Sequence, residues 1–246
     1  MDKSYPDAEE AISDIYDGAV IAIGGFFTAG VPRELLKAIV NTGKRELTLA
    51  CGCGPLVGAH DELLALVNNG QIKKVIDSYG LFRSASKGQE DPFEQSVRQG
   101  LVELEVYPMG TLAEKYRAAG AGIPAFYTPT GVGSIVEEVV VTNIEANRVP
   151  KETRMFDGKK YILEYALKPD FAFIHAYMGD REGNLVYRKT SRNFNQAMAA
   201  AARITIAEVE NLVDPGELNP NTINTQGIYV QRLVQVKPVK CEISID

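Results

Sequence analysis

The chain has 246 residues, of which 45% are hydrophobic, 24% are charged and 8% are aromatic, and 26 basic residues against 32 acidic ones give a formal net charge of -6. This composition is that of an ordinary globular protein and excludes disordered, collagen-like and coiled-coil chains. No segment concentrates Lys and Arg as a nucleic-acid-binding surface requires, so we expect no nucleic acid as a partner.

The cysteines and the N-terminus indicate where the protein works. Three Cys are too few for a disulfide framework, and their odd number favours a reducing compartment. The N-terminus lacks the basic region of a signal peptide, and the apolar run 19–27 is short and interrupted by Gly24 and Gly25. We therefore expect a cytoplasmic protein without a membrane partner.

The first half of the chain alternates between strand and helix patterns. The predicted elements are a helix over 7–16, a buried strand over 19–23, a helix from Pro32 to Val40, a strand over 46–50, a helix over 61–67 and a strand over 74–76. This alternation predicts an α/β fold, a largely parallel sheet with helices on both faces.

The second half continues the pattern with more irregular stretches. We predict a strand over 101–107, a helix over 111–120, strands over 161–163, 171–176 and 185–187, a helix over 195–202 and a strand over 205–209. The segment 120–133 contains too much Gly and Pro for a regular element. We find no linker or internal repeat, so the prediction is a single domain over 1–246.

A glycine-rich loop follows the first buried strand. It reads Gly24-Gly25-Phe26-Phe27-Thr28-Ala29-Gly30 and leads into a helix that begins near Pro32. Backbone N–H groups at a helix start attract anions or a developing oxyanion, and glycine allows close approach. The loop matches neither the dinucleotide-binding nor the Walker pattern. From these residues alone, a plain strand-to-helix turn and a phosphate or acyl-oxygen site remain equally open.

Several motifs resemble those of a known family. The first is Asp17-Gly18-x-x-Ile21-Ala22-Ile23-Gly24-Gly25-Phe26-x-x-x-Gly30-x-Pro32, and further matches lie at 110–114, 119–131, 180–184 and 188–195. In these motifs the chain resembles the class I coenzyme A transferases, and within them the A (alpha) subunit of the acetate/3-oxoacid type. The resemblance covers about residues 10–235 and implies a modified doubly wound sheet like that of the sugar-phosphate isomerases.

The resemblance implies a two-subunit enzyme whose nucleophilic glutamate belongs to a partner B (beta) subunit, in an α2β2 assembly. That glutamate forms a glutamyl-CoA thioester during transfer of CoA between an acyl-CoA and a carboxylic acid. For this chain it implies no catalytic residue, no metal and no tightly bound cofactor, with coenzyme A bound as substrate. Residues 24–30 are expected to contact CoA, and Tyr79 and Met109 to shape the acyl pocket.

Two departures from the family pattern bear on the substrate. Ser78-Tyr79 is followed by Gly80-Leu81-Phe82-Arg83 where the family usually continues Gly-Glu-Asn after one residue, and Met109 stands where it commonly has Gln. Met has no N–H donor, and the loss of one oxyanion donor costs about 2.7–4 kcal/mol. Another donor replaces it, or the pocket is more apolar, or the reaction differs. We hypothesise an acyl group larger or less polar than acetate or succinate.

Other reactive residues have simpler interpretations. His175 ends an apolar strand and is expected to be a hydrogen-bonded structural residue. The group Arg188, Lys189 and Arg192 either pairs with CoA phosphates or lies on a solvated or subunit-contacting face. Asn193 and Asn195 are expected to cap a helix. Cys51-x-Cys53 lacks the spacing of a zinc site.

Two alternative functions remain open on the sequence alone. One is an acyl-CoA hydrolase or lyase that keeps the transferase fold and CoA site. The other is a ligand-sensing domain on an isomerase-like sheet. A partner subunit without its nucleophilic Glu would favour the first alternative over a transferase.

Overall fold

The computed structural model describes residues 1–52, 60–79, 92–144 and 150–238. The main sheet contains β1 (Ser4–Tyr5), β2 (Val20–Ile23), β3 (Leu47–Ala50), β4 (Ile72–Asp77), β5 (Glu103–Val106), β7 (Val141–Thr142), β10 (Phe171–Asp180), β11 (Leu185–Val186), β12 (Ile204–Val213) and β13 (Arg232–Gln235). A smaller sheet contains β6 (Ala125–Thr128), β8 (Thr153–Phe156) and β9 (Lys159–Tyr165).

The helices are α1 (Ala8–Ala11), α2 (Arg33–Thr42), α4 (His60–Asn68), α5 (Pro92–Arg98), α6 (Met109–Gly120), α7 (Ile135–Glu138) and α8 (Asn195–Ala201). Short 3-10 turns occur at η1 (Lys189–Arg192), η2 (Pro220–Thr222) and η3 (Gly227–Tyr229). No helix in the described ranges is long and apolar enough to cross a bilayer.

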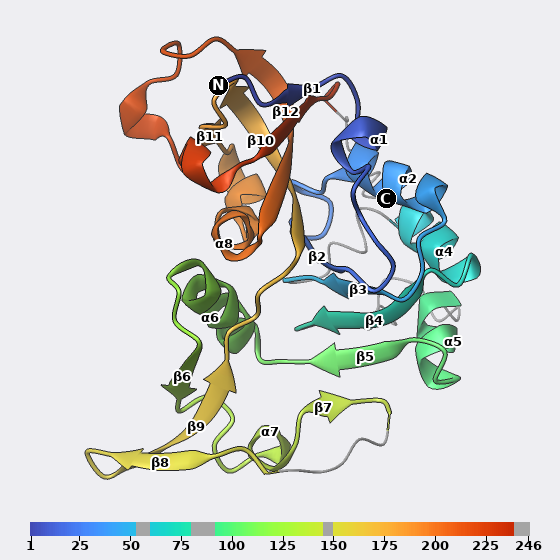
Figure 1. Ribbon diagram of the computed structural model, residues 1–246. Helices are drawn as coiled ribbons and strands as arrows, with labels where there is room; N and C mark the ends of the chain where they lie inside the picture. The colour runs from blue at the N-terminus through green and yellow to red at the C-terminus, as the bar shows by residue number, and fades with distance from the viewer. Residues whose placement is uncertain (53–59, 80–91, 145–149, 239–246) are drawn as a thin grey trace, which may run out of the picture.

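The main sheet is largely parallel, as the alternation of elements predicts. Its order in the described part of the chain is β1-β13-β12-β10-β2-β3-β4-β5-β7 (Figure 1). Every neighbouring pair from β1 to β5 is parallel, whereas β7 pairs with β5 and β11 with β10 in antiparallel fashion. The smaller sheet is antiparallel and lies at the lower edge of the molecule in Figure 1.

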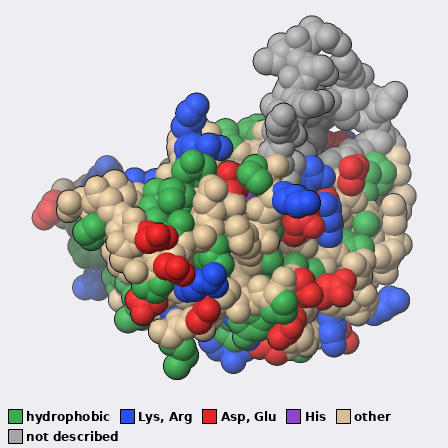
Figure 2. Space-filling view, turned by 90° about the horizontal axis from the view of Figure 1, so that it is seen from above, with side chains coloured by type: hydrophobic (Ala, Val, Ile, Leu, Met, Phe, Trp, Pro, Cys, Tyr) green, Lys and Arg blue, Asp and Glu red, His purple; other side chains and the backbone are tan. Residues whose placement is uncertain are grey.

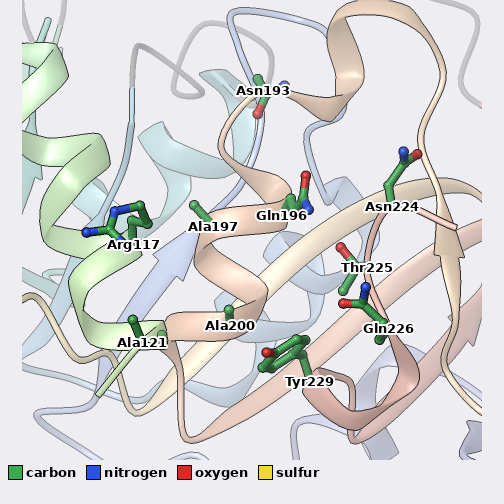
Figure 3. A pocket seen from close by; sticks show the side chains of 11 residues that line it. Arg117, Ala121, Asn193, Gln196, Ala197, Ala200, Asn224, Thr225, Gln226 and Tyr229 are labelled. Atoms are coloured by element: carbon green, nitrogen blue, oxygen red, sulfur yellow. The ribbon is translucent and has the colours of Figure 1, made fainter. Parts of the chain in front are cut away.

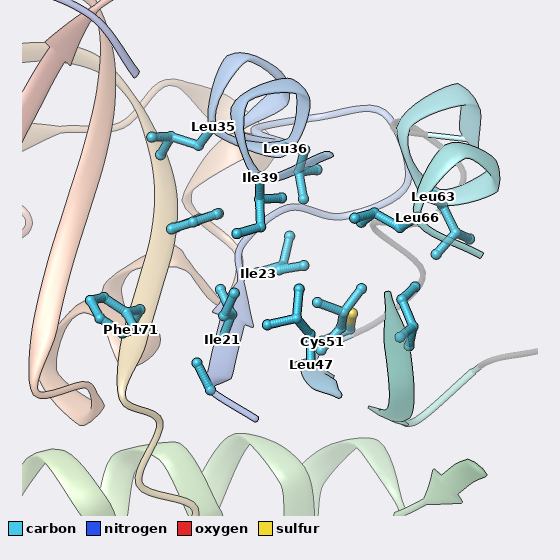
Figure 4. Close-up of a cluster of buried hydrophobic side chains, with 14 of the residues drawn as sticks. Ile21, Ile23, Leu35, Leu36, Ile39, Leu47, Cys51, Leu63, Leu66 and Phe171 are labelled. Atoms are coloured by element: carbon cyan, nitrogen blue, oxygen red, sulfur yellow. The ribbon is translucent and has the colours of Figure 1, made fainter. Parts of the chain in front are cut away.

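Helices cover both faces of the main sheet, and each face has its own apolar cluster. One cluster joins α1, α2, α4 and α5 to the sheet, and Figure 4 shows Leu35 and Ile39 of α2 above Ile21 and Ile23 of β2. The other cluster joins α6 and α8 to the opposite face through Leu112, Tyr116 and Met198, among others. Because both faces are covered, the central strands read as continuous apolar runs.

The N-terminal helix is shorter than the periodic pattern predicts. Only Ala8–Ala11 are helical, and the next turns are closed by tighter bonds, from Ser13 N to Glu10 O and from Ile15 N to Ile12 O. Ile12 and Ile15 remain buried in these turns. The apolar spacing therefore predicts correctly that these side chains are buried, but their burial does not require a continuous helix.

The prediction that 120–133 lacks a regular element is wrong at its centre. Ala125–Thr128 form β6, which pairs with β9 from Ala125 opposite Tyr165 to Thr128 opposite Ile162. Pro124 and Pro129 stand just outside this strand. The Gly and Pro signals mark the ends of the strand, and the pairing partner that stabilises it lies more than thirty residues away.

Candidate functional site

The glycine loop lies where the strand order of the main sheet reverses. From β2 the chain proceeds to β3 on one side, whereas from β10, the neighbour of β2 on the other side, it proceeds to β12. Loops that leave the carboxyl ends of two such strands diverge, and ligands of open α/β sheets bind in the resulting crevice. The loop 24–32 connects β2 to α2 at this point.

The loop folds as a tight hairpin. Phe26 and Ala29 exchange two backbone hydrogen bonds of 2.9 Å each, so Phe27 and Thr28 form the turn. Gly25 and Gly30, on either side of the hairpin, have φ angles of 117° and 69°, which favour glycine. Glycine at these two positions therefore suits the backbone on either side of the turn.

A segment far away in the sequence holds the loop in place; we call residues 188–195 the strap. Asn193 accepts a hydrogen bond from Gly25 N at 3.2 Å and donates to Ala29 O at 3.3 Å. The fully buried Asn195 donates to Gly30 O at 3.2 Å and accepts from His175 N at 3.3 Å.

These contacts correct the expectation that both asparagines cap a helix. The residue before α8 is Phe194, which makes no side-chain capping bond, and Asn195 is the first residue inside that helix. Its side chain bonds the loop and the strap, with Ser191 O as a further acceptor at 2.7 Å. A helix start was correctly located, but the partners of its polar side chains come from distant elements.

Two glycines of the loop are required by the strap. A Cβ atom on Gly24 would lie 1.7 Å from Asn195 Oδ1, and one on Gly30 would lie 2.7 Å from Ser191 O. These separations are far below van der Waals contact, so a larger residue at either position would displace the strap. Close packing between loop and strap thus explains Gly24 and Gly30 without any ligand.

A cavity of about 260 Å³ opens between the loop and the strap. Its described lining consists of Thr28, Ala29, Gly30, Val31, Arg33, His175, Tyr177, Arg188, Lys189, Thr190, Ser191 and Glu210. Of the glycine-loop residues predicted to contact CoA, Thr28, Ala29 and Gly30 line this cavity. Arg188 and Lys189 line it too, so two of the three basic residues singled out in the sequence reach the site.

Two of the three basic residues that line this cavity lie next to carboxylates. Arg33 makes two hydrogen bonds to Glu62, and Arg188 approaches Glu210 at 3.7 Å while its guanidinium lies 4.3 Å from the centre of the Tyr177 ring. Figure 2 shows basic and acidic side chains next to one another on the face of the molecule that is seen from above. An anionic ligand would therefore meet local cations and no uniformly basic surface.

His175 lies on one wall of the cavity between two carboxylates. Its Nδ1 is 3.3 Å from Glu208 Oε2, and its Nε2 is 3.2 Å from Glu210 Oε1. Burial lowers the pKa of His175, but the hydrogen bonds and charges of Glu208 and Glu210 outweigh it, so the pKa lies above the ordinary 6.5. Burial raises the pKa of Glu208, and the bond from His175 opposes that rise. The expected hydrogen bonding of His175 is thus present.

Sequence reasoning missed Glu208 and Glu210. Glu208 is 2% exposed within a strand whose neighbours Ala207 and Val209 are fully buried. A charged residue inside an apolar run is a usable signal, because a buried carboxylate needs a partner. What the sequence does not show is that His175 is that partner, since the pairing depends on the parallel register of β10 and β12.

The residues predicted for the acyl pocket lie elsewhere along the carboxyl edge of the sheet. Tyr79 follows β4 and Met109 begins α6 directly after β5, and both are about half exposed. Neither belongs to the described lining of the cavity beside the glycine loop. The departure at residues 80–83 and Cys53 lie outside the described residues.

A second cavity, of about 420 Å³, lies between α6, α8 and the segment 224–229. Figure 3 shows Gln196, Thr225 and Gln226 around it, with Arg117 on α6 at the left and Tyr229 at the bottom. Asn193 lines this cavity and also bonds the glycine loop. No sequence motif had indicated it.

Comparison with known proteins decides the family. The family model described as coenzyme A transferase matches residues 5–236. The chain belongs to the coenzyme A transferase family. The resemblance found in the sequence motifs is therefore confirmed.

Curated relatives are similar over nearly their whole length. The chain is 43% identical to the A-type subunit of a probable succinyl-CoA:3-ketoacid coenzyme A transferase of Mycobacterium tuberculosis, with 96% of this chain and 94% of the relative covered. It is 44% identical to the A-type subunit of the 3-oxoadipate CoA-transferase of Acinetobacter baylyi, with 96% of each chain covered. The protein is thus a CoA-transferase subunit of the A type.

Solved structures confirm the fold class. Glutaconate coenzyme A-transferase of Acidaminococcus fermentans has a TM-score of 0.76 at 23% identity and covers 96% of this chain and 76% of its own. The decarboxylase AibA/AibB has a TM-score of 0.75 at 27% identity and covers 96% of this chain and 84% of its own. The decarboxylase is less similar in sequence than the two curated transferase subunits, which are 43% and 44% identical, so a transferase is favoured over a hydrolase or lyase.

Proposed function

We propose that this chain works with a B subunit to move CoA between an acyl-CoA and a free carboxylic acid, and that the glutamate forming the glutamyl-CoA thioester belongs to the partner. The relatives of the A type support the division into two chains. We further propose a single domain over 1–246, an α2β2 assembly and a cytoplasmic location.

The observation that carries this proposal is the state of Glu210. It is the one carboxylate in the described lining of the cavity beside the glycine loop. It is engaged by His175 at 3.2 Å and by Arg188 at 3.7 Å, so both contacts hold it on the cavity wall. A carboxylate held by two cationic partners is less free to attack a thioester than an unpaired one. The attacking carboxylate is therefore expected from another chain.

The glycine loop is proposed as part of the CoA-binding surface. Residues 24–30 stand beside the N-terminus of α2, and Arg188 and Lys189 supply positive charge on the facing strap. Such groups suit the phosphates of a nucleotide-like tail. Binding of that tail can lower the barrier at the distant thioester. CoA acts here as a substrate, and we propose no tightly bound cofactor.

Tyr79 and Met109 are proposed to shape the acyl pocket. They follow two adjacent parallel strands, and Tyr107 N bonds Asp77 O at 3.1 Å just before them. Pro108 gives α6 no side-chain cap, and a Cβ on Gly110 would meet open space. Backbone N–H groups in the first turn of α6 can therefore serve in place of a glutamine side chain. With the apolar Met109 beside them, they fit an acyl group larger or less polar than acetate or succinate.

The experiment supplies the complex of this chain and its B subunit with acyl-CoA and a carboxylic acid acceptor. The proposal predicts that the CoA thioester of the acceptor forms at the same rate as the CoA thioester of the donor is lost, without release of free CoA. Free CoA produced at the same rate without an acceptor would show the hydrolase instead. A panel of acyl groups tests the pocket, and clear preference for acetate or succinate would contradict the substrate proposal.

A further inference from the structure

Two acceptor groups face the two nitrogens of one imidazole. An ionised carboxylate only accepts hydrogen bonds, whereas a neutral imidazole donates from one nitrogen alone. Glu208 and Glu210 lie within hydrogen-bond distance of Nδ1 and Nε2 respectively. Both contacts are therefore satisfied when the ring of His175 carries two protons. Both contacts would also be satisfied if the ring were neutral and Glu208 carried the second proton. The surroundings of Glu208 distinguish these two protonation states.

The hydrogen bonds that Glu208 accepts favour its charged form, against burial, which raises its pKa. Its second oxygen, Oε1, accepts from Leu35 N at 2.7 Å, and Leu35 is the third residue of α2. The N-terminus of a ten-residue helix stabilises a negative charge on such an acceptor. Because Pro32 offers no side-chain cap, Glu208 takes that role from β12. His175 and α2 thus share one buried carboxylate between them.

The other side of the ring is joined to the strap. Glu210 links Nε2 of His175 to Arg188, the residue before η1. The backbone N–H of His175 also bonds Asn195, which holds Gly30. The imidazole therefore connects the start of α2, through Glu208, to the strap, through Glu210, while the backbone of the same residue reaches the glycine loop through Asn195.

The charges around His175 come from four elements. Glu208 and Glu210 belong to β12. Arg33 and Glu34 belong to α2, and Glu62, the partner of Arg33, belongs to α4. The strap adds two further charged groups, Arg188 and Lys189. Arg33 is engaged by Glu62 and Arg188 by Glu210, so neither replaces the imidazolium beside Glu208.

We propose that His175, as an imidazolium, is a positioning residue that holds the start of α2, into which the glycine loop leads, against the strap and thereby supports acyl-CoA binding. This proposal rests on the CoA-binding role proposed above for the loop. Loss of the proton leaves two carboxylates facing a ring with one donor, so one of the two links opens. Acyl-CoA binding then weakens as the pH rises, while the chemical step on the partner's glutamate is little affected.

The first test reads the protonation directly. The chain has only two histidines, so a preparation labelled in its imidazole nitrogens gives two sets of NMR signals, and His60→Gln assigns them. In the assembled complex the proposal predicts that His175 is doubly protonated at pH 6.5 and loses a proton at higher pH. A neutral ring at pH 6.5, with the proton on Glu208, would overturn it.

The second test separates positioning from a merely structural role. His175→Gln removes the charge, and we expect KM for acyl-CoA to rise about tenfold at pH 6.5 with kcat little changed, the size of one lost charge-assisted hydrogen bond. His175→Lys keeps a positive charge up to high pH, so KM should stay low and lose its pH dependence. The control Glu46→Gln alters an exposed ion pair with Lys73 at the other end of the sheet and should keep the parent profile.

A parent enzyme whose KM does not change between about pH 6 and pH 9 would overturn the proposal. So would a Lys variant with the same loss of affinity as the Gln variant. Failure of the proposed function is a different result, because the complex would then transfer no CoA in any variant while the NMR titration would still report the state of His175.

Discussion

Asn195 donates a hydrogen bond to the carbonyl oxygen of Gly30 at 3.2 Å, although 165 residues separate the two in the chain. The same side chain accepts from His175 N and leaves no room for a side chain on Gly24. This buried amide, together with the two bonds that Asn193 makes to the loop, therefore determines how the glycine loop lies against the strap. The shape of the candidate site depends on this contact as much as on the glycines themselves.

Replacement of Asn195 by Ala should both destabilise the chain and impair the site. The buried N–H of His175 and the partly buried carbonyls of Gly30 and Ser191 lose their partner, and we expect a loss of about 1–3 kcal/mol in the free energy of unfolding. KM for acyl-CoA should rise as the loop loosens. Urea unfolding and steady-state kinetics measure both effects, with the exposed Asn221→Ala as the control. Unchanged stability in the Asn195 variant would contradict this role.

Gly24→Ala tests the same contact from the opposite side. The new Cβ would lie 1.7 Å from Asn195 Oδ1, so the strap must move, at a cost of about 1–3 kcal/mol. The matched control is Gly110→Ala in α6, where a Cβ meets nothing within 4 Å, and which should stabilise by about 0.5–1 kcal/mol. Denaturant titration of both variants checks the opposite signs. If the two variants changed the free energy of unfolding equally, the clash at Gly24 would be relieved without cost, and the prediction would be contradicted.

The sequence predicted the parallel sheet, the helices on both its faces and the place of the glycine loop, because these depend on local periodicity and on residues adjacent in the chain. It did not predict β6, whose partner β9 is remote in sequence, or the true partners of Asn195. Nor did it show that Glu208 and Glu210 flank His175. These features depend on strand register and on the crossing of distant segments, which no local pattern encodes.

The stability of the chain should fall as the pH rises through the ionisation of His175. The pKa of His175 is raised in the folded state, so its contribution is complete below about 6.5, the value for an unfolded histidine, and is lost as the pH passes the folded value. Heat-denaturation midpoints between about pH 6 and pH 9 measure this change. His175→Lys should be less sensitive over that range. A denaturation midpoint that rises with pH in the parent chain but not in His175→Lys would contradict the predicted fall.

Met109→Gln should shift substrate preference. A glutamine restores an N–H donor at the start of α6, where Met109 is about half exposed. We expect higher kcat/KM for short, polar acyl groups, by up to about the 10²–10³ of one oxyanion donor, and lower values for larger apolar ones. Competition between two acyl-CoA donors measures the ratio directly. Met109→Leu is the control for side-chain size and should leave the preference unchanged.

The most direct test of the central claim is to locate the covalent intermediate. The complex of this chain with its B subunit is mixed with acyl-CoA in the absence of an acceptor, trapped with borohydride and mapped by mass spectrometry. The account predicts a modified glutamate on the partner and none on this chain, with Glu210 unmodified. A trapped adduct on Glu210, or turnover without any adduct, would contradict it.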